Sequence, residues 1–85
     1  MGKREKFLRR IYNHPIPKDI KYREMAYFLL SIGCKSQKRT GFSHRNFKHP
    51  DFPDIITLME EETIKPYQIR KIRELLEHIS IVEED

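Results

Sequence analysis

The 85-residue chain contains one cysteine, three glycines and no tryptophan, and it has no long hydrophobic run. The single cysteine, Cys34, cannot form an internal disulfide, which excludes a disulfide-stapled secreted domain and favours the reducing cytoplasm. No segment approaches the roughly 20 apolar residues that a membrane-spanning helix needs, and the first residues lack the apolar core of a signal peptide. We therefore expect a soluble cytoplasmic protein without membrane association.

The chain is also too short for two domains. At 85 residues and 38% hydrophobic content it lies near the lower limit at which one core sustains folding. We predict one domain over residues 1–85, with a helical extension over residues 1–14 and the core of the fold over residues 20–80.

Acidic residues are absent from residues 34–50, which carry five basic side chains: Lys35, Lys38, Arg39, Arg45 and Lys48. Residues 51–62 show the reverse pattern, with five acids and no base. The net charge of +4 and this segregation favour an anionic partner such as nucleic acid. The alternative interpretation of the basic segment is a solvated face without a ligand.

Three segments have the periodicity of helices. Residues 3–12 carry one apolar face and predict a short helix, and residues 22–32 repeat apolar side chains at helical spacing up to Gly33, a residue suited to a left-handed helix end. Residues 66–79 start with proline at the first helical position and continue with an apolar stripe. We predict a helix for each segment.

Three further segments have the character of strands. Residues 34–40 and 43–49 flank Gly41 and predict a hairpin, and the β-branched, apolar residues 54–59 predict a third strand. The predicted fold class is α+β, with a three-stranded antiparallel sheet, two main helices on one face and an extra N-terminal helix.

His44 is the strongest candidate for chemistry. Alternation along the strand puts Phe47 on one face and His44, Asn46 and Lys48 on the other, so His44 faces solvent if Phe47 faces the helices. An imidazole with an unperturbed pKa of about 6.5 can transfer a proton at neutral pH, and neighbouring cations can hold a phosphate. This pairing suits RNA cleavage by an adjacent 2′-hydroxyl, whereas a solvated histidine without a role is the simpler alternative.

The remaining candidates have mostly structural interpretations. We assign His14 and His78 structural roles, and we expect His49 to end its strand by hydrogen bonding. Phe42, next to Gly41, could stack on a base or fold back on the core. No pair of cysteines or histidines has metal-ligand spacing, which predicts no metal site. The cations of the last helix are interpreted as a solvated face: Arg70, Lys71 and Arg73.

Two motifs together resemble a known family. Ser43-His44-x-x-Phe47-x-His49-Pro50 is followed by a short apolar strand and then by Ile64-Lys65-Pro66-Tyr67-x-Ile69-Arg70. This order resembles the HicA-type toxins of bacterial toxin-antitoxin systems over most of the chain. The N-terminal helix and the Lys-Pro-Tyr opening of the last helix are similar to one subgroup of that family.

The resemblance implies a fold like that of a double-stranded RNA-binding domain, used as a messenger-RNA endonuclease without a metal or other cofactor. It implies that His44, the histidine of the Ser-His motif, is catalytic, and that a HicB-type antitoxin is the protein partner. The RNA-binding residues expected around His44 are Lys38, Arg39, Phe42, Arg45 and Lys48.

Two features depart from the family pattern and leave alternatives open. Phe42 separates Gly41 from Ser43 where the family commonly has glycine directly before the Ser-His pair, and an acidic run occupies residues 60–62. A non-catalytic RNA-binding module, or a degenerate toxin that binds RNA or antitoxin without cutting, is the first alternative. The second is a pure interaction protein whose basic face binds an acidic partner.

Overall fold

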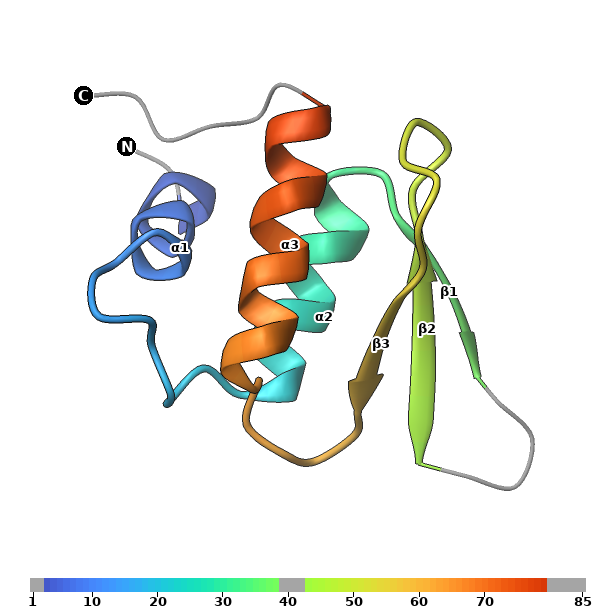
Figure 1. Ribbon diagram of the computed structural model, residues 1–85. Helices are drawn as coiled ribbons and strands as arrows, with labels where there is room; N and C mark the ends of the chain where they lie inside the picture. Colours follow the sequence, from blue (N-terminus) through green and yellow to red (C-terminus); the bar gives the residue numbers. More distant parts are fainter. Residues whose placement is uncertain (1–2, 39–42, 80–85) are drawn as a thin grey trace.

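The computed structural model describes residues 3–38 and 43–79. Its elements, in chain order, are α1 (Lys3–Ile11), α2 (Tyr22–Ser31), β1 (Lys35–Lys38), β2 (His44–Lys48), β3 (Ile56–Met59) and α3 (Pro66–His78). The strands form an antiparallel sheet in the order β1-β2-β3, and Figure 1 shows all three helices on one side of it. The predicted α+β class and the antiparallel three-stranded sheet are confirmed, although the described strands are shorter than the predicted ranges.

In both main helices, the lysine that directly precedes the first helical residue donates its backbone amide to a side chain of the first turn. The Lys21 amide donates to the Glu24 carboxylate at 3.2 Å, and the Lys65 amide donates to the Gln68 side-chain carbonyl at 2.8 Å. These bonds satisfy amide groups that a helix start leaves without a partner. At the other end of α2, Gly33 has a φ of 106°, as predicted for a helix terminator.

The chain segments that precede α2 and α3 lie side by side. Lys21 and Thr63 form an isolated antiparallel bridge, and the Ile64 amide donates to the Ile20 carbonyl at 2.8 Å. The two helices consequently start together, at the bottom of Figure 1, and run in the same direction. This contact joins parts of the chain that are distant in sequence.

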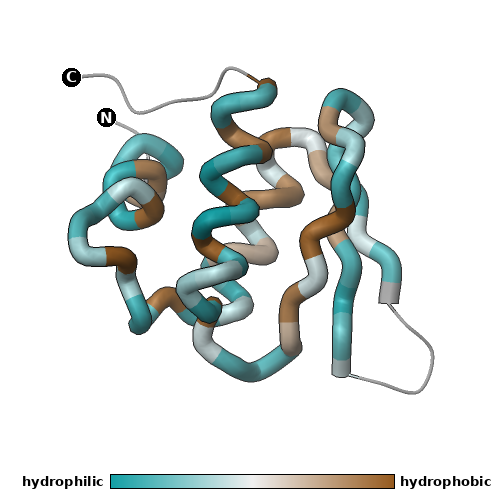
Figure 2. Tube along the Cα trace, viewed as in Figure 1, coloured by the Kyte–Doolittle hydropathy of each residue, from teal (hydrophilic) through white to brown (hydrophobic). Residues whose placement is uncertain are grey.

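The core lies between the sheet and the helices. Phe47, Ile56 and Leu58 fill the sheet side of it and are at most 2% exposed. Figure 2 shows hydrophobic residues recurring along α3 and within β3, whereas β2 is mostly hydrophilic. The helices contribute most of the remaining buried side chains: Leu8, Ile11, Met25, Phe28, Leu29, Ile69, Ile72, Leu75 and Leu76.

Helix α1 is attached to the rest of the fold by both apolar and polar contacts. Leu8 and Ile11 belong to the hydrophobic cluster. Arg73 of α3 donates to the Ile11 carbonyl at 2.9 Å and to the Asn13 carbonyl at 3.0 Å, and its guanidinium carbon lies 5.6 Å from the centre of the Tyr12 ring. The interpretation of Arg73 as a solvated residue is therefore wrong, because its side chain holds the end of α1.

Candidate functional site

The sheet has one face packed on the helices and one face turned away from them. Because side chains alternate along a strand, the burial of Phe47 and Leu58 against the helices puts their neighbours His44, Asn46 and Met59 on the opposite side. We call that side the open face. Its members on the three strands are Lys35, Gln37, His44, Asn46, Lys48, Thr57 and Met59.

The strand register arranges the open face in rows across the sheet. The middle row is polar: Gln37 lies opposite Asn46, and the Thr57 hydroxyl donates to the Asn46 side-chain carbonyl at 2.8 Å. At one end of the sheet Lys35 lies opposite Lys48, so the two lysines among the described residues of the open face share a row. The described strand residues of the open face include no carboxylate.

His44 occupies the other end of the open face, at the first residue of β2. It pairs across the sheet with Met59. The side chain is half-buried, and its Nδ1 atom is shielded from solvent. Only part of the imidazole is therefore open to a ligand, which is less exposure than alternation alone predicted.

Lys48 is on the same face as His44 but not beside it. They are four positions apart, which corresponds to about 13 Å along an antiparallel strand. The Lys48 ammonium donates to the carbonyl oxygens of His49, at 2.9 Å, and of Phe52. It therefore points toward the turn that follows β2, and the structure does not bring it to the histidine.

Arg45 lies on the helix-facing side of the sheet, opposite Leu58. Its Nη2 and Nε atoms lie 3.1 and 3.3 Å from the same carboxylate oxygen of Glu60. Tyr22 is close to this pair; burial raises the pKa of its hydroxyl, an effect that Arg45 opposes and Glu60 adds to. Arg45 is thus neutralised and separated from His44 by the sheet, so its placement gives it no direct route to a phosphate at the histidine.

The other predicted RNA-binding residues are in or next to the β1–β2 connection. Lys38 is the last residue of β1 and its backbone pairs with Arg45. Arg39 and Phe42 lie outside the described residues, and so does the side chain of Lys38. Their predicted roles stay predictions.

His49 has the structural role expected of it. Its Nδ1 accepts a hydrogen bond from the Asp51 amide at 3.0 Å, and its Nε2 lies 3.1 Å from the Ile32 carbonyl. Since Nδ1 accepts, the proton lies on Nε2, which donates to Ile32. A side chain at Gly33 would come within 3.3 Å of the His49 ring, so the glycine also makes room for the imidazole.

A cleft of about 760 Å³ opens beside the His44 end of the sheet, and sequence reasoning did not predict it. Its lining residues come from the start of α2, the residue before β2 and the β3–α3 connection: Lys21, Tyr22, Arg23, Ser43, Glu60, Glu61, Glu62 and Thr63. The bridge between Lys21 and Thr63 forms one wall. No local sequence signal marks such a cleft, because its walls lie about 40 residues apart in the chain.

The carboxylates of the cleft are partly neutralised. Glu60 pairs with Arg45, and Glu62 lies 3.5 Å from the Lys65 ammonium. Both main helices also begin at this end, where the positive pole of a helix favours nearby carboxylates. Ion pairs thus partly neutralise Glu60 and Glu62, whereas Glu61 is an exposed carboxylate of the cleft.

The part of the chain described by the structure, residues 3–38 and 43–79, brings together no cluster of three histidine, cysteine or acidic side chains suited to a metal ion. Nor does any helix within those residues combine the length and apolar character needed to cross a bilayer. Comparisons with protein-family models, with curated proteins and with solved structures find no match to this chain.

Proposed function

We propose that the protein is a HicA-like messenger-RNA endonuclease, the toxin of a toxin-antitoxin pair, in which His44 is the general acid or base. The observation that carries the proposal is the position of His44 on the open face of the sheet, at the end that adjoins the Ser43 cleft. The order of α2, three strands and α3 supports a fold like a double-stranded RNA-binding domain, with α1 as the additional helix.

The proposed reaction needs no metal. The 2′-hydroxyl of a nucleotide attacks the adjacent phosphorus, the bond to the 5′-oxygen of the next nucleotide breaks, and a cyclic phosphate remains. His44 accepts the hydroxyl proton or protonates the leaving oxygen, and a water molecule carries out the other proton transfer. The described cations of the open face are Lys35 and Lys48, at the other end of the sheet from His44. Lys21 and Arg23 line the Ser43 cleft, to which His44 does not contribute.

The test is cleavage of messenger RNA by purified protein in the presence of EDTA, comparing the parent with His44→Ala. A general acid or base typically contributes about 10²- to 10⁴-fold in rate, so we expect a loss of that order. His14→Ala is the matched control, because His14 is exposed and lies after α1, remote from the sheet in sequence. Equal cleavage by the parent and His44→Ala would overturn the proposal.

The same pair of variants tests the biological role. Induced expression of the parent in a bacterial host should arrest growth and deplete full-length messages, and His44→Ala should do neither. Co-expression of a HicB-type antitoxin, the partner that the resemblance implies, should restore growth. If both forms arrested growth, toxicity would not depend on His44, and the proposed role of this residue would be contradicted.

A second candidate is RNA binding without cleavage. It is favoured by the distance between His44 and the lysine pair and by the neutralisation of Arg45. Binding would then depend on Lys35 and Lys48, and the double variant Lys35→Gln/Lys48→Gln should lower the slope of log K against log salt by about 1.4 to 1.8. Salt-dependent binding that is lost in this variant, without cleavage by the parent, would establish this candidate instead.

A further inference from the structure

A second concave surface lies between α1 and α2. It is a groove of about 610 Å³, lined by Arg4, Phe7, Arg23, Glu24, Tyr27, Phe28 and Ser31. It shares Arg23 with the Ser43 cleft and otherwise has different walls, because it lies along the outer side of α2. We call it the α1–α2 groove.

The middle of the groove is apolar and aromatic. The Phe7 and Phe28 rings pack against each other with their centres 5.1 Å apart. Tyr27, which lines the groove, is 78% exposed. Exposed aromatic side chains next to a concave apolar surface are the features from which protein interfaces are built.

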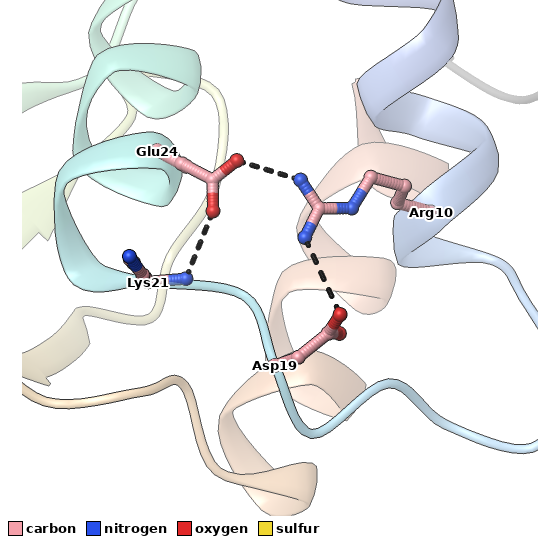
Figure 3. Close-up of polar contacts among 4 residues, drawn as sticks. All are labelled: Arg10, Asp19, Lys21 and Glu24. Atoms are coloured by element: carbon pink, nitrogen blue, oxygen red, sulfur yellow. Dashed lines mark hydrogen bonds and ion pairs between the residues drawn. The ribbon is translucent and has the colours of Figure 1, made fainter.

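The charge at the groove is positive once its internal ion pairs are considered. Glu24 is the acidic residue among the lining residues, and Arg10 neutralises it through an ion pair of 2.6 Å, as Figure 3 shows. The same arginine reaches Asp19 at 3.9 Å. The hydrogen bond from Arg10 holds the pKa of the Glu24 carboxyl below its usual range, so this carboxylate stays ionised and paired. Arg4 and Arg23 remain as cations at the groove.

The two cations lie at opposite ends of α2. Arg23 is in the first turn, whereas Arg4 donates to the Ser31 carbonyl in the last turn at 3.5 Å. Ser31 is eight positions after Arg23, which corresponds to about 12 Å along the helix. Tyr27 lies midway between them. An apolar surface with a cation at each end is complementary to an apolar segment with a carboxylate at each end.

We propose that the α1–α2 groove binds a peptide segment of a partner protein in which apolar side chains lie between two acidic residues. The acids would be about four positions apart in an extended segment, at about 3.3 Å per residue, or seven to eight apart in a helix, at about 1.5 Å per residue. The proposal is independent of the ribonuclease reaction, because the groove does not include His44 or Ser43.

The test is binding of two fluorescein-labelled twelve-residue peptides to the full chain, measured by fluorescence polarisation. Each peptide carries leucine and phenylalanine between two glutamates, at the extended spacing in one and at the helical spacing in the other. Control peptides replace both glutamates with glutamine or with lysine. We expect one glutamate peptide to bind about 2- to 30-fold more tightly than its glutamine control, from two exposed ion pairs.

Substitutions in the protein locate the binding site. The double variant Arg4→Glu/Arg23→Glu should lower the affinity for the glutamate peptide by a similar factor. It should also bind the lysine peptide more tightly than the glutamate peptide. Both positions lie in the first turn of a helix, where an acid is favoured, so the fold should be kept. Tyr27→Ala should weaken all peptides, and Arg70→Glu, at an exposed position of α3, is the control for net charge.

Three outcomes would overturn the proposal. The first is the absence of binding, or binding that neither the glutamines nor the groove substitutions change. The second is displacement of the peptide by oligoribonucleotides whose own binding needs Arg4 and Arg23, which would make the groove a nucleic-acid site. The third is a concentration-dependent dimer that Tyr27→Ala abolishes, which would make a second copy of the chain the occupant.

Discussion

Replacement of Arg73 by methionine tests how α1 is held to the fold. The substitution keeps most of the aliphatic stem and removes the guanidinium. It deletes the hydrogen bonds to the Ile11 and Asn13 carbonyls and the contact with the Tyr12 ring. It also removes a positive charge from the C-terminal end of α1, where a cation is favourable.

The expected loss of unfolding free energy can be estimated from these contacts. A hydrogen bond from a charged donor contributes about 1.5–3 kcal/mol when shielded and less when exposed, and here one of the two is exposed. A cation above an aromatic ring contributes about 0.5–1 kcal/mol at an exposed site. Allowing for non-additivity, we expect Arg73→Met to lower the free energy of unfolding by about 2–3 kcal/mol. For a domain of this size that corresponds to a Tm roughly 10–20 °C lower.

Two measurements check the prediction. Urea denaturation gives the change in unfolding free energy, with Arg70→Met as the control on the same helix, because Arg70 is exposed. Hydrogen exchange shows where the loss occurs: the amides of α1 should lose protection before those of β2. If Arg73→Met were no less stable than Arg70→Met, the attachment of α1 by this side chain would be refuted.

Three further predictions concern single side chains. Glu24→Gln should lower stability at neutral pH by up to about 1 kcal/mol, the upper value for an exposed ion pair. Because the pKa of Glu24 is lowered in the folded state, its stabilisation is present above the unfolded pKa and is lost as pH falls through the folded pKa, so the two proteins should converge in acid denaturation curves. Gln68→Leu should cost about 1–3 kcal/mol in urea melts, because the buried amide donates to the Thr57 carbonyl at 3.0 Å and its loss leaves that oxygen without the bond. Burial raises the pKa of the Cys34 thiol to about 11, so a thiol reagent at pH 8 should label it only when the protein is unfolded, as mass spectrometry can show.

Sequence periodicity was sufficient for the helices and for the faces of β2. Apolar spacing predicted α3, glycine chemistry predicted the end of α2 at Gly33, and alternation correctly separated Phe47 from His44. The same alternation places Arg45 on the side of Phe47, so its separation from His44 was available in the sequence. The prediction that Arg45 binds RNA rested on its charge and did not take this position into account.

Contacts between segments that are distant in the chain could not be predicted from the sequence. The Ser43 cleft depends on the bridge between Lys21 and Thr63, and nothing near either residue signals the other. The place of Lys48 depends on carbonyl oxygens of the following turn, which sequence patterns do not locate. The distribution of charge therefore indicates the basic segment of residues 34–50, but it does not predict the direction in which the side chains point.

The attachment of α1 to α3 also bears on how the chain folds during synthesis. Arg73 contacts residues that precede it by 60 and 62 positions, so α1 leaves the ribosome well before its partner exists. At about 5–20 residues per second, the interval is roughly 3–12 s. During that time the hydrogen bonds from Arg73 to the end of α1 cannot form, and a chaperone that binds short basic amphipathic segments would find α1 accessible until the last helix arrives.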